Sequence, residues 1–138
     1  MKIRQWSVKK WENITVEGNV TTTGDASAGV IGENDSNITV NGDITTSGGS
    51  IKGKDENGEY WRSSDGVIAN GATVKVNGDI TVSGTGSAGV SANNNATVEV
   101  TGNVEAKGDN QTHEGQTGGT YIDKWADGVE ADNGSKVT

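Results

Sequence analysis

The sequence predicts an all-β solenoid, in which the chain winds into stacked coils that pair as parallel sheets. The first reason is composition: the 138 residues include 22 Gly, 14 Asn and 16 Thr, but no Leu, Phe, Pro or Cys. Leu is the commonest residue of helical cores, so a helical domain without it is not expected. The second reason is a strand-like motif that recurs at a regular interval, and the third is period-two alternation between turn residues.

The recurring motif is a heptapeptide that opens each unit of the chain. It reads Ile-Thr-Val-Glu-Gly-Asn-Val in its first copy. Complete copies occupy residues 14–20, 38–44, 74–80 and 98–104, and a fifth begins at Val137. The copies start 24, 36, 24 and 39 residues apart, which indicates a 24-residue unit with insertions of 12 and 15 residues in the second and fourth units.

A Gly-Val pair, preceded by Ala or Asp, follows the heptapeptide in every unit and marks a further strand. Its valines are Val30, Val67, Val90 and Val129. Each unit therefore contains three short alternating runs separated by Gly, Asn or Asp, residues that supply the backbone conformations of sharp corners. Three such runs in a 24-residue coil predict three short parallel sheets around one narrow core.

Stacking of the units predicts which side chains point inward. The inward columns are expected to contain β-branched residues only, which stack well in ladders and leave no room for Leu or Phe. The predicted columns are Ile14/Val16, Ile38/Val40, Val74/Val76 and Val98/Val100 in the first sheet, Val20, Ile44, Ile80 and Val104 in the second, and Val30, Val67, Val90 and Val129 in the third.

Disorder is the alternative that the bulk composition favours. Val, Ile, Leu and Phe together make up about 17% of the chain, and the formal net charge is −8, a combination typical of disordered segments. A disordered chain has no reason to keep a 24-residue register across two insertions, so the repeat favours the solenoid.

The motif V-x-V-x-G-D/N-I/V followed by G-V-x-A, repeated over residues 13–138, resembles the coils of right-handed parallel β-helices. These belong to the pectate-lyase-like superfold that is common in bacterial cell-surface adhesins and autotransporter passengers. The resemblance implies an extracellular or cell-surface location in a bacterium. It specifies a fold rather than an activity. A left-handed hexapeptide helix fits less well, because 24 is not a multiple of its 18-residue coil.

The expected organisation is a capping segment followed by a solenoid. Residues 1–12 supply Trp6, Trp11 and four basic residues to cover the first end, and they lack the continuous apolar stretch of a signal peptide. Residues 13–138 form four coils and the start of a fifth. Because the chain ends inside a strand motif, we expect it to be the N-terminal part of a longer solenoid. The rival interpretation is that the two ends stack head to tail into a fibre.

The aromatic residues outside the leading segment lie in the two insertions. Both insertions are expected at one corner of the solenoid, in coils two and four, and insertions at one corner commonly mark a binding face. Flat aromatic rings stack on sugars, and charged neighbours bind hydroxyl groups. The candidate glycan patch consists of Tyr60, Trp61, Arg62, Tyr121, Asp123 and Trp125. The alternative is that these aromatic residues only anchor their own loops.

The remaining chemistry is sparse. The acidic residues of the insertions form no recognisable pair or ladder for glycoside hydrolysis, so an enzyme is not expected. His113 is the only histidine and the chain has no Cys, which makes a poor metal site. The acidic corners lack the spacing of a calcium-binding loop, so at most weak Ca²⁺ binding is expected. No cofactor is expected. The negative charge argues against nucleic acid, and no apolar run is long enough for membrane insertion.

The function expected from these features is that of a non-enzymatic, surface-displayed stem or adhesin. Its rigid β-helix would present the corner loops to a glycan or to a host or cell-surface protein. The alternative is a structural solenoid that assembles end to end, and a fragment of a polysaccharide-active enzyme is a distant third.

Overall fold

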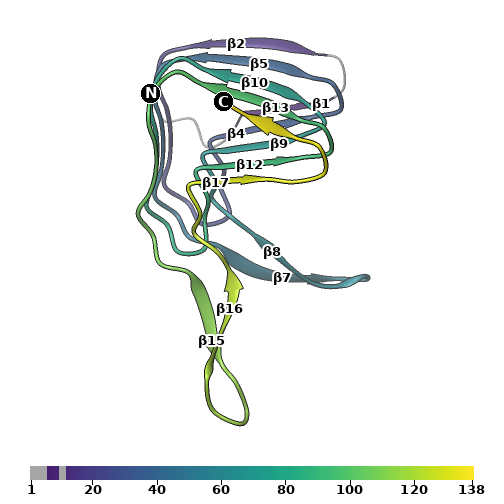
Figure 1. Cartoon of the computed structure of the whole chain (residues 1–138), viewed down its shortest axis with the longest axis vertical. Coiled ribbons are helices and arrows are strands. Elements are labelled where there is room, and N and C mark those ends of the chain that lie inside the picture. Colours follow the sequence, from purple (N-terminus) through teal and green to yellow (C-terminus); the bar gives the residue numbers. More distant parts are fainter. Residues whose placement is uncertain (1–5, 10–11) are drawn as a thin grey trace.

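The computed structural model describes residues 6–9 and 12–138, and this part of the chain contains strands but no helix. Fourteen of the strands form three parallel sheets that enclose one core (Figure 1). Sheet A contains β1 (Trp6–Lys9), β4 (Val30–Glu33), β9 (Val67–Asn70), β12 (Val90–Asn93) and β17 (Val129–Ala131). Sheet B contains β2 (Asn13–Glu17), β5 (Asn37–Asn41), β10 (Thr73–Val76), β13 (Thr97–Val100) and β18 (Lys136–Val137). Sheet C contains β3 (Val20–Thr22), β6 (Ile44–Thr46), β11 (Ile80–Val82) and β14 (Val104–Ala106).

The strands of successive coils pair in register. In sheet B, equivalent residues of neighbouring strands pair one after another. The order along the stack is Asn13, Asn37, Thr73, Thr97 and Lys136. Coil one runs from β2 to β4, coil two from β5 to β9, coil three from β10 to β12 and coil four from β13 to β17. The predicted all-β class and the stacked parallel sheets are confirmed.

The core is built mainly from β-branched side chains of all three sheets, with Ala69, Ala92 and Ala96 between them. Val40, Val76, Ile44 and Ile80 are among its fully buried members. In coil four, Val100 and Val104 are only half-buried and Val129 is 47% exposed. The predicted inward positions of coils two and three are therefore buried. Ile14 in coil one is half-buried, and in coil four only Val98, which lies beneath β18, is fully buried.

Two glycine columns show why the corners need residues without a side chain. A Cβ added to Gly48, Gly84 or Gly108 would overlap the carbonyl oxygen of the glycine one coil earlier. The same holds for Gly42, Gly78 and Gly102 at the corner between sheets B and C. None of these six glycines has a positive φ, so the close approach of successive coils, rather than backbone strain, requires glycine here.

Asn and Asp side chains connect the coils at the corner between sheets B and C. The backbone N–H of Asp43 donates to Asn19 Oδ1, that of Asp79 to Asp43 Oδ1 and that of Asn103 to Asp79 Oδ1, each at 2.8 Å. Each side chain satisfies a backbone donor that has left the sheet ladder, which explains the D/N position of the repeat.

The predicted capping segment is described only in part. Its residues 6–9 form β1, which pairs in parallel with β4 and extends sheet A by one strand. The remaining residues of the segment up to residue 11, and the side chains of β1, lie outside the described part of the structure. No helix in the described residues is long and apolar enough to cross a membrane.

Candidate functional site

Two antiparallel hairpins leave the solenoid between sheets C and A. Hairpin 1 consists of β7 (Ile51–Asp55) and β8 (Gly58–Arg62) and lies between β6 and β9. Hairpin 2 consists of β15 (Gln111–Glu114) and β16 (Thr120–Lys124) and lies between β14 and β17. Both project from the same side of the stack, away from sheet B (Figure 1).

The bases of both hairpins rest on the short corner of coil three. Ser50 donates its backbone N–H to the carbonyl of Thr85, and Gly86 donates its own to Asp109, each at 2.8 Å. A Cβ on Gly86 would lie 2.5 Å from Ser50 Oγ and 2.9 Å from the Cβ atoms of both Gln111 and Lys124. Gly86 also has a positive φ of 64°. The bases of both hairpins therefore pack closely against this one residue.

Hairpin 1 carries its candidate residues on opposite faces. Tyr60 is paired with Gly53, and its ring covers the space that a side chain at Gly53 would fill. The Arg62 guanidinium lies 5.2 Å from the centre of the Tyr60 ring, within cation–π range. Trp61 points to the other face, across from Lys52. Both aromatic side chains are half-buried, as expected of residues that stiffen a small hairpin.

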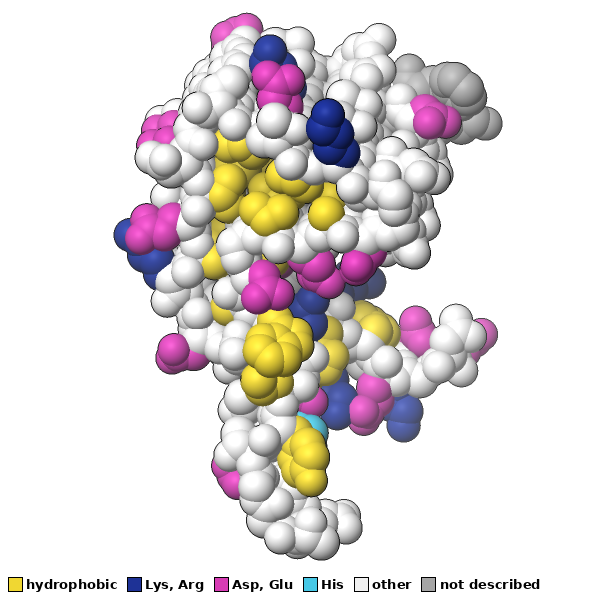
Figure 2. All heavy atoms as spheres, viewed as in Figure 1, with side chains coloured by type: hydrophobic (Ala, Val, Ile, Leu, Met, Phe, Trp, Pro, Cys, Tyr) yellow, Lys and Arg dark blue, Asp and Glu magenta, His cyan; other side chains and the backbone are white. Residues whose placement is uncertain are grey.

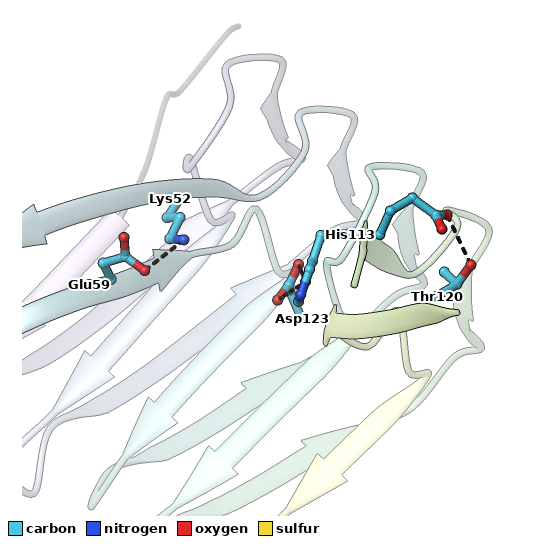
Figure 3. Close-up of polar contacts among 6 residues, drawn as sticks. Lys52, Glu59, His113, Thr120 and Asp123 are labelled. Atoms are coloured by element: carbon cyan, nitrogen blue, oxygen red, sulfur yellow. Dashed lines mark hydrogen bonds and ion pairs between the residues drawn. The ribbon is translucent and has the colours of Figure 1, made fainter. Parts of the chain in front are cut away.

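Hairpin 2 is held by a cross-strand contact of its histidine. His113 and Tyr121 are strand partners, and their rings stack with centroids 5.6 Å apart and an interplanar angle of 20°. His113 Nδ1 also lies 2.9 Å from both carboxylate oxygens of Asp123 (Figure 3). Asp123 is thus engaged within the hairpin, whereas Tyr121 remains 52% exposed.

Trp125 follows the last residue of β16 and is 58% exposed. Hydrophobic side chains are visible along the hairpins and over the open end of the solenoid (Figure 2). A tryptophan with this exposure contributes little packing to its own loop, since most of its apolar area stays in contact with water.

The two hairpins influence each other electrostatically. The pKa of Lys52 on β7 is raised chiefly by its ion pair with Glu59, whose oxygen lies 2.6 Å away, and to a smaller extent by Asp123 on β16. Figure 3 shows Lys52 and Glu59 on the paired strands of hairpin 1 and Asp123 on hairpin 2. Lys52 of hairpin 1 and Asp123 of hairpin 2 are therefore close enough to interact through their charges. The short contacts of these two residues, to Glu59 and to His113, each lie within one hairpin.

A buried carboxylate lies at the base of hairpin 1. Asp65 is 3% exposed and accepts the backbone N–H of Ala88 at 2.7 Å. Burial raises the pKa of Asp65, while the hydrogen bonds from Ala88 and Ser63 oppose the shift. The sequence contains a signal for this residue, because coils one and three have Ala28 and Ala88 where coil two has Asp65, although the repeat alone does not indicate that the carboxylate is buried.

Serines complete the polar base beside Asp65. Ser27 donates its backbone N–H to Ser64 Oγ at 3.0 Å, and Ser64 donates its own to Ser87 Oγ at 2.9 Å. Ser64 Oγ in turn donates toward the carbonyls of Gly24 and Gly49. These hydrogen bonds satisfy buried backbone groups between β8 and β9, where hairpin 1 returns to sheet A. The base of hairpin 1 is therefore fixed to the solenoid.

The structure thus groups the candidate residues in two sets rather than one. Tyr60 and Arg62 share a face of hairpin 1, and Tyr121 and Asp123 meet on His113 in hairpin 2. Within the described residues, the close ring contacts lie inside a hairpin and none joins the two. Sequence reasoning missed His113 as a member of the site, since a lone histidine in a polar loop gave no signal of its stacking partner.

No group of three or more His, Asp or Glu side chains in the described residues is arranged to hold a metal ion. Comparison with protein-family models, with curated proteins and with solved structures found no match for this chain. The functional argument therefore rests on the geometry of the hairpins and of the solenoid that carries them.

Proposed function

We propose that this chain is a non-enzymatic, surface-displayed stem or adhesin that presents its aromatic hairpins to a glycan or a protein partner. The observation that carries the proposal is the exposure of Tyr121 and Trp125, at 52% and 58%, on hairpin 2, whose base is hydrogen-bonded to Gly86 of coil three through Asp109. The Tyr121 ring is held by its stacking on His113, so it loses little conformational entropy on binding, which favours affinity.

A glycan is the partner class that we favour. Flat rings stack on the C–H faces of sugars, and the exposed Arg62 guanidinium is a donor to hydroxyl groups. Asp123 contributes charge at the rim, where it is bound to His113. The half-buried Tyr60 and Trp61 would then support hairpin 1, while hairpin 2 supplies the main contact surface.

The finer architecture belongs to the same proposal. We assign the chain to the right-handed parallel β-helices of the pectate-lyase-like superfold, with coils of about 24 residues and insertions at one corner of coils two and four. The resemblance to bacterial adhesins and autotransporter passengers supports an extracellular or cell-surface location. In this view residues 1–12 cap the solenoid that residues 13–138 form.

The experiment is a broad glycan-array screen of the wild-type chain beside two variants. Trp125→Ala removes the most exposed ring of hairpin 2, and Ile51→Ala removes an apolar side chain of similar exposure, 45%, from hairpin 1. We expect a specific signal that Trp125→Ala weakens at least about tenfold, the loss of one stacked ring, and that Ile51→Ala retains.

Circular dichroism and thermal unfolding of both variants provide the control for folding. A signal that survives Trp125→Ala would place the glycan site elsewhere. A blank array would exclude the glycan form of the proposal and leave a protein partner or a purely structural stem.

A further inference from the structure

In the described residues no complete coil stacks on coil four. At the third-sheet position, Val30, Val67 and Val90 are fully buried, whereas Val129 is 47% exposed. In the described part of the chain, β14, β17 and β18 each have a neighbour on one side only. Apolar core and unpaired strand edges therefore coincide at this end, the combination that favours pairing with another strand.

The free edge of β17 has backbone groups in position for a further parallel strand. The carbonyl of Gly128 accepts the N–H of Val90, and Asp132 donates its N–H to the carbonyl of Ala92, so this C=O and this N–H point to β12. Because peptide groups alternate sides along a strand, the N–H groups of Val129 and Ala131 point away from β12. In earlier coils the residue equivalent to Val129 donates to the next coil, as Val90 does to Gly128 at 3.0 Å.

The opposite end of the molecule offers a matching pair of strands. The first strand of sheet A is β1 and that of sheet B is β2, and both have a free edge in the described part of the chain. Their equivalent positions, Trp6 and Asn13, are seven residues apart, and so are Val129 and Lys136 of β17 and β18. The corner between sheets A and B therefore has the same length at both ends.

We propose that a second copy of this chain docks head to tail, so that its β1 pairs with β17 and its β2 with β18. The register that runs through sheet A places Trp6 of the second copy opposite Val129 and Lys9 opposite Asp132. In sheet B the same continuation places Asn13 opposite Lys136.

The N-terminal part of the sequence is basic, and the part that forms coil four is acidic. Residues 1–10 contain Lys2, Arg4, Lys9 and Lys10 and no acidic residue, which gives a charge of +4. Residues 97–138 contain eight Asp or Glu and three Lys, which gives −5 with His113 neutral. Opposite charge favours encounter of the basic head with the acidic tail and disfavours head-to-head or tail-to-tail contacts.

The proposed contact has a defined geometry. Sheets A and B continue across the junction, but sheet C skips one strand, because no described strand lies between β14 and β3 of the next copy. Since two of three sheets pair, we expect association to depend on concentration in the micromolar range. The contact is heterologous and does not close, so it generates a filament. Each copy would advance the filament by five coil heights, about 24 Å at roughly 4.8 Å per parallel strand.

Sedimentation velocity of the full 138-residue chain, from about 10 µM to 1 mM, the range of weak association, tests the proposal. We expect a reversible series of oligomers that salt weakens, and filaments with a repeat of about 24 Å in electron micrographs. Ala131→Pro removes an N–H that faces the free edge and leaves the pairing with β12 intact. This variant should stay monomeric while its thermal unfolding remains close to that of the wild type.

A charge swap tests the register directly. Lys9→Asp and Asp132→Lys each place like charges opposite one another and should each reduce association at least about tenfold by repulsion at close range. An equimolar mixture of the two variants restores opposite charges at every junction and should assemble like the wild type.

Three outcomes would overturn the proposal. These are a monomer at every concentration, an oligomer that Ala131→Pro leaves unchanged, and a mixture of the charge variants that assembles no better than either alone. A closed dimer that depends on Trp125 would point instead to the hairpins as the contact surface.

Discussion

The carboxylate of Asp65 in coil two accepts the backbone N–H of Ala88 in coil three at 2.7 Å, in a position where it is 3% exposed. The contact ties the coil that carries hairpin 1 to the coil whose corner supports both hairpins. It also buries a charge, which raises the pKa of Asp65.

The first prediction concerns the charge of Asp65. Asp65→Asn keeps an oxygen for Ala88 and removes the desolvation of the carboxylate, so we expect the free energy of unfolding at pH 7 to rise by about 1 kcal/mol. Asp65→Ala leaves the N–H of Ala88 without its acceptor and should lower that free energy by about 1–3 kcal/mol. Urea unfolding of the three proteins measures both effects, and equal losses in both variants would contradict this role of the charge.

The pH dependence has a definite sign. The folded state binds a proton at Asp65 more tightly than the unfolded chain, whose pKa is about 3.8. This contribution to stability is complete below pH 3.8 and is lost as the pH rises through the higher pKa of the folded state. The stability of the wild type relative to Asp65→Asn should therefore fall with increasing pH over this window and then level off.

The second prediction compares two glycines of one column. A Cβ on Gly89 would overlap Val104 Cγ1, whereas a Cβ on Gly128, one coil later, meets no atom within 4 Å. Gly89→Ala should lower the free energy of unfolding by about 3 kcal/mol or more through overpacking, and Gly128→Ala should change it little. Similar losses in thermal unfolding would show that the coils are not stacked as described.

The third prediction tests the inward and outward positions of the strands. Val76 is fully buried, and Thr81 on the next strand is only half-buried and faces outward beside Glu105. Val76→Lys places a charge without a partner in the core and should unfold the chain, whereas Thr81→Lys should be almost silent. Circular dichroism distinguishes the two results, and comparable effects would refute the assignment of faces.

The fourth prediction concerns Gly86, against which the bases of both hairpins pack. Gly86→Ala would push against Ser50, Gln111 and Lys124 and would also strain a positive φ. We expect faster hydrogen exchange in residues 50–62 and 109–125 while the three sheets stay protected.

Gly118→Ala is the matched control for Gly86→Ala. Gly118 also has a positive φ, of 85°, but a Cβ there meets no atom within 4 Å. This substitution should cost only the backbone strain, about 1 kcal/mol. Equal exchange in the two variants would mean that the hairpins do not depend on the corner of coil three.

The repeat made much of the fold predictable. Parallel strands of a solenoid pair position by position, so the four copies of the heptapeptide and the recurring Gly-Val pairs indicated which residues share a column. The two aromatic insertions were also visible, because insertions stand out against a regular repeat, but nothing in the sequence indicated that they fold as hairpins. The contact between His113 and Tyr121 was not visible, since it depends on the register of a hairpin whose strands have no counterpart in the other coils.

The sequence by itself determined the strand class, the stacking order and the inward columns of the heptapeptide and the Gly-Val pair, because these follow from local alternation repeated at a constant interval. It did not indicate the further inward positions, such as Val82 and Ala92. Only the tertiary structure decided what surrounds each position. Asp65 and Asp127 occupy the same place in the repeat, yet Asp65 is buried and Asp127 is exposed. The difference arises because burial depends on whether a further coil lies above a residue, and Asp65 lies beneath coil three whereas Asp127 belongs to the open end.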